Sequence, residues 1–282
     1  MKNSTPKSLE PIQTAQVVTI LGQTTEGRDA ETYKVELIDQ DGRSITGYLK
    51  LTDDPRKLIA ELAAAQLGRA LGLSVPRPLL AILDTADLRP EFRSAFAHKG
   101  HMICFASQQT SKRSYSLERG FNDCGAQVAD ALEAQFDMPA AIAFDELIAN
   151  DDRNLGNIMF SPESRKFWLI DHGRALTGSY WKLWGLSDPA VSVGNVLAEN
   201  AAKVWDDHLK KKAAERANDL AKQCATLCLD DLDLDGHFAK IDPTTDRQEI
   251  IQFLRARLYH MVPLICRRLN IGQACLMLPA GS

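Results

Sequence analysis

Apolar and polar positions follow two different patterns along the chain. In the first 108 residues, with the exception of one helical segment, apolar residues form short β-branched or alternating runs. These runs end at glycine or charged residues. Runs of this kind predict β-strands, here at residues 17–21, 33–38, 45–51, 79–83 and 101–106. The Asp41-Gly42 pair between the second and third runs is a hairpin signal. The N-terminal region is therefore predicted to be rich in β-structure.

Helical spacing of apolar residues dominates the rest of the chain and one segment within the β-rich region. That segment covers residues 55–71, where Gly72 is expected to cap the helix and Pro76 to force extended chain. Further helices are predicted at residues 125–136, 140–149, 193–228 and 248–269. The polar residues 1–12 are expected to be mobile.

Three polar side chains between residues 144 and 176 have the spacing of a single site. Asp152 and Asn157 are five residues apart, and Asp171 follows the apolar run 167–170. Two short apolar runs separated by the polar turn at Pro162, Glu163 and Ser164 predict a β-hairpin. A turn centred on Ser164 pairs residues whose numbers sum to 328, which places Asn157 opposite Asp171.

The chemistry of these side chains indicates phosphoryl transfer. An amide oxygen and a carboxylate, from Asn157 and Asp171, are hard oxygen ligands that suit Mg²⁺. A further carboxylate, Asp152, can orient a hydroxyl or accept its proton. A base Asp, an Asn five residues later and a second metal-binding Asp followed by x-Gly form the layout of phosphoryl-transfer enzymes.

The β-rich region contains a lysine and a glutamate that fit the same chemistry. Lys50 lies on the third predicted strand, and Glu61 lies at the edge of the apolar stripe of helix 55–71. A carboxylate there can hold the lysine ammonium on nucleotide phosphates. The alternative is an exposed strand lysine, with Glu61 solvated and paired with Arg56 or Lys57.

The loop at residues 22–31 is a second candidate for contact with phosphates. It carries glycines that include Gly27 and the hydroxyls of Thr24 and Thr25. Backbone N–H groups of such a loop can donate to anions. Thr24 and Thr25 are also candidate self-phosphorylation sites.

Three segments together resemble a known family. The sequence D-R-N-L-G-N at 152–157 and I-D-H-G at 170–173 resemble the HipA-like kinases and, at this motif alone, the phosphatidylinositol 3- and 4-kinases. E-L-A-A-A-Q-L-G-R-A-L-G-L-S-V-P at 61–76 is similar to the HipA-like pattern in particular. The resemblance implies an α+β, bilobal protein-kinase-like fold. Its parts would be a flexible N-terminus at 1–12, a β-rich N-lobe at 13–108 and a helical C-lobe at 109–282.

The resemblance also implies cofactors and roles. ATP and Mg²⁺ would be bound, with Lys50, held by Glu61, on the α- and β-phosphates. Asn157 and Asp171 would hold Mg²⁺, and Asp152 would orient the acceptor hydroxyl.

Two further site assignments follow from the same resemblance. Adenine would bond the hinge at 107–115, with contact around Phe105 and Ser107. The family usually has His after D-R, where this chain has Asn154. Asparagine cannot take up a proton, so Asn154 is expected to hydrogen-bond the γ-phosphate instead.

Composition and charge exclude several classes of protein. A net charge of −4 argues against a general nucleic-acid binder. No run of 18 apolar residues predicts a membrane span, and the first 11 residues lack the apolar core of a signal peptide. Six scattered cysteines do not form a disulfide framework, so a reducing cytoplasm is the expected compartment.

The sequence leaves open which molecule accepts the phosphate. HipA-like kinases act on Ser or Thr of proteins, and some are toxins restrained by a partner, so the resemblance implies a protein substrate and admits a regulatory partner. A lipid kinase is the rival enzyme, although Arg174 and Lys182 are the only basic residues in the segment 174–190 that follows Gly173. A pseudokinase that senses nucleotide or docks a partner is the rival binding module, although all core side chains are present.

Overall fold

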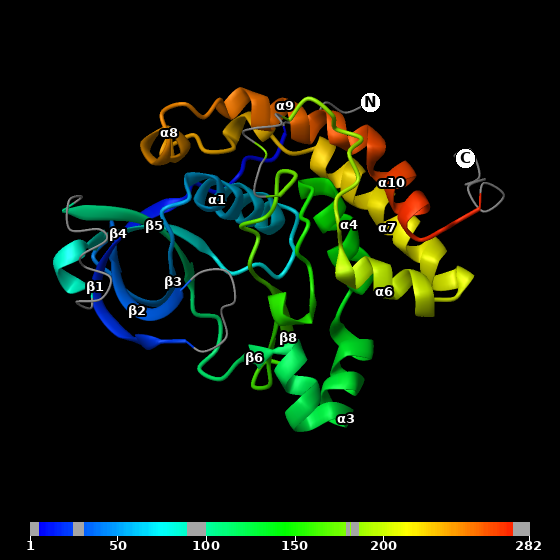
Figure 1. Cartoon of the computed structure of the whole chain (residues 1–282), viewed down its shortest axis with the longest axis horizontal. Coiled ribbons are helices and arrows are strands. Elements are labelled where there is room, and N and C mark those ends of the chain that lie inside the picture. The colour runs from blue at the N-terminus through cyan, green and yellow to red at the C-terminus, as the bar shows by residue number, and fades with distance from the viewer. Residues whose placement is uncertain (1–5, 25–30, 89–99, 179–180, 182–185, 273–282) are drawn as a thin grey trace.

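The N-terminal part of the chain is built from strands and the C-terminal part from helices. The computed structural model describes residues 6–24, 31–88, 100–178, 181 and 186–272 (Figure 1). This arrangement confirms the α+β class predicted from the sequence. Among the described residues, no helix combines the length and apolar character needed to cross a membrane.

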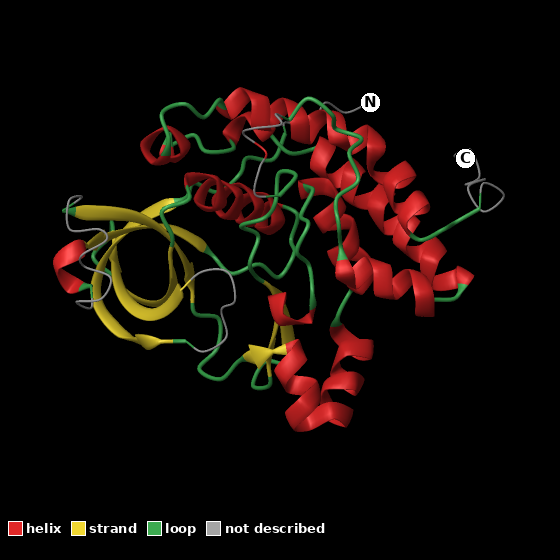
Figure 2. Ribbon diagram, viewed as in Figure 1, coloured by secondary structure: helices red, strands yellow, loops and turns green. Residues whose placement is uncertain are grey.

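Five strands close into a barrel in the order β1-β2-β3-β5-β4 (Figure 2). The strands are β1 (Gln13–Gln23), β2 (Glu31–Asp39), β3 (Ser44–Leu51), β4 (Pro78–Asp84) and β5 (His101–Gln108). β1 and β4 pair in parallel, and the other neighbours pair antiparallel. Alternate side chains point into the barrel, and Val35, Leu49 and Leu79 in this core are fully buried.

Helix α1 (Pro55–Ala70) lies between the barrel and the C-terminal helices (Figure 1). Asp54 caps it by accepting from the Arg56 amide, and Pro55 occupies the first turn, where no amide donor is needed. The sequence predicted one apolar stripe with Glu61 at its edge. The helix is instead buried on nearly every side, and Glu61 and Gln66 are only 2% and 4% exposed.

The C-terminal part consists of a small three-stranded sheet and a group of helices. The strands are β6 (Tyr115–Ser116), β7 (Ile158–Ser161) and β8 (Lys166–Leu169). The helices are α3 (Leu117–Gln135), α4 (Met138–Ile148), α6 (Val196–Val204), α7 (Asp207–Ala225), α8 (His237–Ile241), α9 (Arg247–Arg257) and α10 (Met261–Arg268). The helix predicted at 193–228 is broken, because Asp206 caps a new helix.

Residues 6–12 correct the expectation of a mobile N-terminus at 1–12. Leu9 and Ile12 are 2% and 3% exposed, so they belong to the apolar core. Lys7 forms a β-bridge with Leu227 of the C-terminal part. The segment was predicted to be mobile because most of its residues are polar, but its two apolar residues Leu9 and Ile12 are buried. Residues 1–5 lie outside the described part of the chain.

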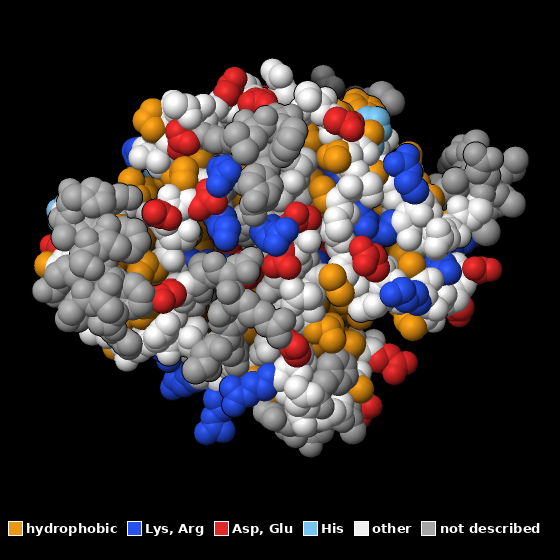
Figure 3. Space-filling model, in the orientation of Figure 1, with side chains coloured by type: hydrophobic (Ala, Val, Ile, Leu, Met, Phe, Trp, Pro, Cys, Tyr) orange, Lys and Arg blue, Asp and Glu red, His pale blue; other side chains and the backbone are white. Residues whose placement is uncertain are grey.

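Charged side chains of both signs are interspersed on the molecular face that Figure 3 shows. Several Lys and Arg side chains gather at the lower left edge of this view, and elsewhere on it basic and acidic side chains are mixed.

Candidate active site

The hairpin that carries the site differs from the predicted one by one residue in register. Ile158 pairs with Leu169, so paired residue numbers sum to 327 and not to 328. The Ile170 amide donates to the Asn157 carbonyl at 3.1 Å, and Asn157 therefore faces Ile170 and not Asp171. The error arose because the connecting turn contains four residues, 162–165, and is centred between two of them.

A left-handed backbone conformation at Asp171 directs its side chain to the site despite the one-residue difference in register. Asp171 has φ of 59°, in the left-handed region that residues other than glycine rarely adopt. This conformation interrupts the alternation of the strand, and the Asp171 carboxylate reaches the Lys50 ammonium, with 2.6 Å between Nζ and Oδ1. Strained residues of this kind cluster at functional sites.

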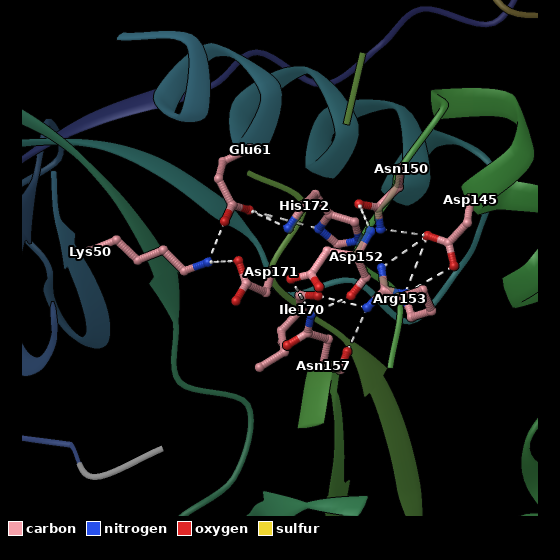
Figure 4. A network of polar contacts seen from close by, with 10 residues as sticks. All are labelled: Lys50, Glu61, Asp145, Asn150, Asp152, Arg153, Asn157, Ile170, Asp171 and His172. Atoms are coloured by element: carbon pink, nitrogen blue, oxygen red, sulfur yellow. Dashed lines mark hydrogen bonds and ion pairs between the residues drawn. The ribbon is translucent and has the colours of Figure 1, made fainter. Parts of the chain in front are cut away.

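Lys50 lies between two carboxylates, as Figure 4 shows. Its ammonium donates to Glu61 Oε1 and Asp171 Oδ1, and its side chain is 16% exposed. This excludes the alternative of an exposed strand lysine. The alternative pairing of Glu61 with Arg56 is also excluded, because Arg56 pairs with Asp54.

Burial and the three charges set the pKa values of this group. Burial alone would lower the pKa of Lys50, but the charges of Asp171 and Glu61 outweigh it and raise that pKa. Burial raises the pKa of Glu61, an effect that Lys50 partly offsets. Burial would also raise the pKa of Asp171, but Lys50 outweighs it and lowers that pKa. Lys50 and Asp171 are therefore charged at neutral pH.

Two asparagine amides bracket Asp152. Nδ2 of Asn157 donates to the Asp152 carbonyl at 2.8 Å and to its Oδ2 at 3.3 Å. Nδ2 of Asn154 donates to the same carbonyl at 3.0 Å, and its Oδ1 accepts from the Gly156 amide at 2.8 Å. Both ends of the Asn154 amide thus bond within the loop, and its contact with a γ-phosphate stays a prediction. The Asn157 amide oxygen is turned away from Asp152.

A buried ion pair that the sequence analysis missed supports this loop. The guanidinium of Arg153 is fully buried and meets Asp145 of α4, with 3.0 Å between Nε and Oδ2. Its Nη1 donates to the carbonyls of Asn157 and Ile170 at 2.6 and 2.7 Å. Arg153 therefore ties α4 to both arms of the hairpin where the metal-ligand candidates begin (Figure 4). The available signal was a pair of carboxylates, Asp145 and Glu146, within the otherwise apolar segment F-D-E-L-I.

The segment after Asp-His-Gly is joined to the same loop. Arg174 and Asp151 form two hydrogen bonds of 2.7 and 3.0 Å. The amide of Leu176 donates to the Ile148 carbonyl at 2.7 Å. Gly178 has φ of +90°, and a Cβ there would lie 2.3 Å from the Asp151 carboxylate. The residues that follow Asp171 are therefore fixed against the end of α4.

A cavity of about 340 Å³ lies between the barrel and the hairpin. The predicted site residues that line it are Thr24, Lys50, Glu61, Phe105, Ser107, Asn157 and Asp171. Its wall also includes Tyr48, Met159 and Trp168, which the sequence analysis did not select. Thr25 and Gly27 lie outside the described residues. The predicted hinge began too early, because β5 extends to Gln108.

His172 is a buried histidine in the same group. It is 1% exposed, its amide donates to Glu61 Oε2 at 3.0 Å, and its ring meets Phe144 edge-on. Burial, followed by the charges of Arg153 and Lys50, lowers its pKa well below the ordinary value. The imidazole is therefore neutral at neutral pH, and its 3.8 Å approach to Glu61 is not an ion pair.

Acid is expected to destabilise the fold through His172. The unfolded chain takes up a proton on this residue near pH 6.5, whereas the folded chain does so only at lower pH. Folding stability is therefore complete above pH 6.5 and falls as the pH is lowered, by at most about 1.4 kcal/mol per pH unit for one proton. His172→Phe should flatten this slope in urea denaturation between pH 7 and pH 5. An unchanged slope in this variant would contradict the buried neutral imidazole.

Comparison with known proteins places the chain in a family. The profile described as HipA-like kinase matches residues 18–259. Among solved structures, a Helicobacter pylori proinflammatory kinase, CtkA, aligns with 13% identity and a TM-score of 0.47 over 89% of this chain and 97% of that one. No curated protein sequence matches the chain. The match to the profile confirms the resemblance drawn from the motifs, and the chain belongs to the HipA-like kinase family.

Proposed function

We propose that this chain transfers the γ-phosphoryl group of ATP, with Mg²⁺, to a hydroxyl group of a protein serine or threonine. The observation that carries the proposal is that Lys50, Asp171 and Asn157 line a single cavity. Its volume of about 340 Å³ lies within the range of small-molecule sites. Family membership supports the kinase chemistry.

The residues at the end of the hairpin fit a magnesium ion. The Asn157 amide directs its nitrogen to Asp152, so its oxygen is the end available to a cation. The Asp171 carboxylate has a lowered pKa and is ionised, as a hard ligand must be. Asn157 and Asp171 would therefore hold the ion. Bound Mg²⁺ supplies neutralisation of charge on the transferring phosphate.

Lys50, Glu61 and Asp152 would perform the remaining tasks. Lys50 points into the cavity from β3 and would contact the nucleotide phosphates, while Glu61 fixes its ammonium. Asp152 would orient the acceptor hydroxyl and accept its proton. The amides of Asn154 and Asn157 fix the Asp152 backbone, and they favour one position for its carboxylate.

A protein acceptor is favoured over a phosphoinositide by the state of Arg174. Recognition of inositol phosphates needs basic groups that can turn toward the ligand. The Arg174 guanidinium is instead engaged with Asp151 through two hydrogen bonds. Lys182, the other basic residue noted in this segment, lies outside the described residues.

The test is a transfer assay with γ-labelled ATP. Purified chain is incubated with Mg²⁺ and, in separate arms, a protein mixture, phosphoinositide vesicles or no acceptor. We expect label on protein serine or threonine, and complete loss of transfer when EDTA removes the metal. Label on lipid alone would replace the protein-kinase proposal by a lipid-kinase one. Nucleotide binding in a thermal-shift assay without any transfer would favour a pseudokinase and overturn the proposal.

A further inference from the structure

Helix α1, which carries Glu61, is fixed at its other end by segments distant in sequence. Residues 7–12 run along the C-terminal half of α1 and bond both to it and to the region around residues 226–237. We call residues 7–12 the N-terminal strap. In Figure 1 the N-terminal chain passes between α1 and the helices α8 and α9. The strap therefore joins α1 to the C-terminal part.

Gln66 is the side chain at the centre of this junction. It is 4% exposed and lies five residues after Glu61 on the same helix. Its Nε2 donates to the Glu10 carbonyl at 2.8 Å, and its Oε1 accepts from the Asp233 amide at 3.1 Å. One amide thus bonds to the strap and to the segment before α8. A buried polar side chain with both ends satisfied fixes the position of its helix, because any displacement would break these bonds.

The strap is itself bonded to both sides. The Lys7 amide donates to the Thr226 carbonyl, and the Cys228 amide donates to the Lys7 carbonyl, both at 2.9 Å. The Lys7 ammonium donates to the Ala70 carbonyl at the end of α1, at 3.3 Å. At the other end, the Ile12 carbonyl lies 2.7 Å from Nε2 of His237. The contacts at Lys7 and Gln66 therefore bracket the last turn and a half of α1.

We propose that Gln66, with the N-terminal strap, is a positioning residue that fixes α1 where Glu61 meets Lys50. The role rests on the proposed function, because the Lys50–Glu61 pair serves phosphate binding. Glu61 also accepts from the His172 amide at 3.0 Å, so a displaced α1 would disturb the Asp-His-Gly segment as well. The activity would then need no partner to move this helix, since the chain's own N-terminal segment supplies the contact.

Hydrogen exchange tests whether Gln66 and the N-terminal strap fix α1, and it does not require catalysis. Gln66→Met keeps the approximate volume and removes both hydrogen bonds of the amide. We expect amide exchange in residues 58–65 and at His172 to accelerate about tenfold. Leu264→Ala in α10 is the control, because it destabilises a buried position distant from α1. Exchange of α1 at the wild-type rate in Gln66→Met, or equal acceleration in both variants, would overturn the proposal.

A kinetic cycle tests the link to Glu61. In the wild-type background, Gln66→Met is expected to lower kcat/KM about five- to tenfold at a temperature where it remains folded. In the Glu61→Gln background the same change should have almost no further effect, because the pair that Gln66 positions is already lost. Equal losses in the two backgrounds would assign Gln66 a structural role only. Absence of transfer in the wild type would refute the proposed function, and the exchange result would still decide whether Gln66 fixes α1.

Discussion

Replacing Asp152 by alanine is expected to lower phosphoryl transfer by about 10²- to 10⁴-fold, the usual loss when a positioned acid or base is removed. Asp152 follows α4 on the loop that Arg153 anchors, and two asparagine amides bond to its carbonyl. The neighbouring carboxylates of Asp151 and Asp171 are not expected to replace it, since Asp151 is engaged with Arg174 and Asp171 with Lys50. The measurement is the initial rate of transfer at saturating ATP and Mg²⁺.

Two variants separate this effect from a loss of folding. Asp152→Asn keeps the shape of the side chain and removes its capacity to accept a proton, so it should be nearly as inactive as the alanine variant. Glu133→Gln removes a carboxylate from an exposed position on α3 and should retain full activity. Transfer by Asp152→Ala at the wild-type rate would contradict the assignment of Asp152.

The hairpin shows which features of the site the local sequence pattern predicts and which it does not. Two apolar runs around a polar turn correctly predicted strands that bring Asn157 and Asp171 to the open end. The register was wrong because the number of turn residues is not encoded in the alternation of the strands. The positive φ of Asp171 could not be predicted either, since no glycine or turn motif marks that position. The pattern therefore placed these candidate residues at one end of the hairpin, but it did not predict the backbone geometry that joins them.

Contacts distant in sequence account for most of what sequence analysis missed. Helix 55–71 was predicted within one residue of its observed end, because its apolar spacing and caps are local signals. The burial of Gln66 depends instead on residues 7–12 and 231–233, which nothing in the helix sequence indicates. Likewise, Arg153 was visible as part of the D-R motif, but its partner Asp145 belongs to the preceding helix. Local pattern gave the elements, and tertiary contact determined which polar residues are buried.

Arg153→Met is expected to cost about 3–5 kcal/mol of folding free energy, as for other buried ion pairs that lose one member. The change leaves the Asp145 carboxylate buried without its charged partner, and it also removes the donor to the carbonyls of Asn157 and Ile170. Urea denaturation gives the free energy of unfolding. The Asp145→Asn/Arg153→Met double variant should recover the charge penalty only, because the hydrogen bonds that Arg153 donates to both carbonyls are still missing.

Arg56→Met provides the matched control for this prediction. Arg56 also pairs with an aspartate, Asp54, but its side chain is 28% exposed, against 0% for Arg153. Water can solvate the separated charges at Arg56, so the loss there should be about 0–1 kcal/mol. A loss at Arg153 no larger than at Arg56 would mean that the loop bearing Asp152 does not depend on this ion pair. A large loss would identify Arg153 as the residue that couples the order of the loop bearing Asp152 to the helical core.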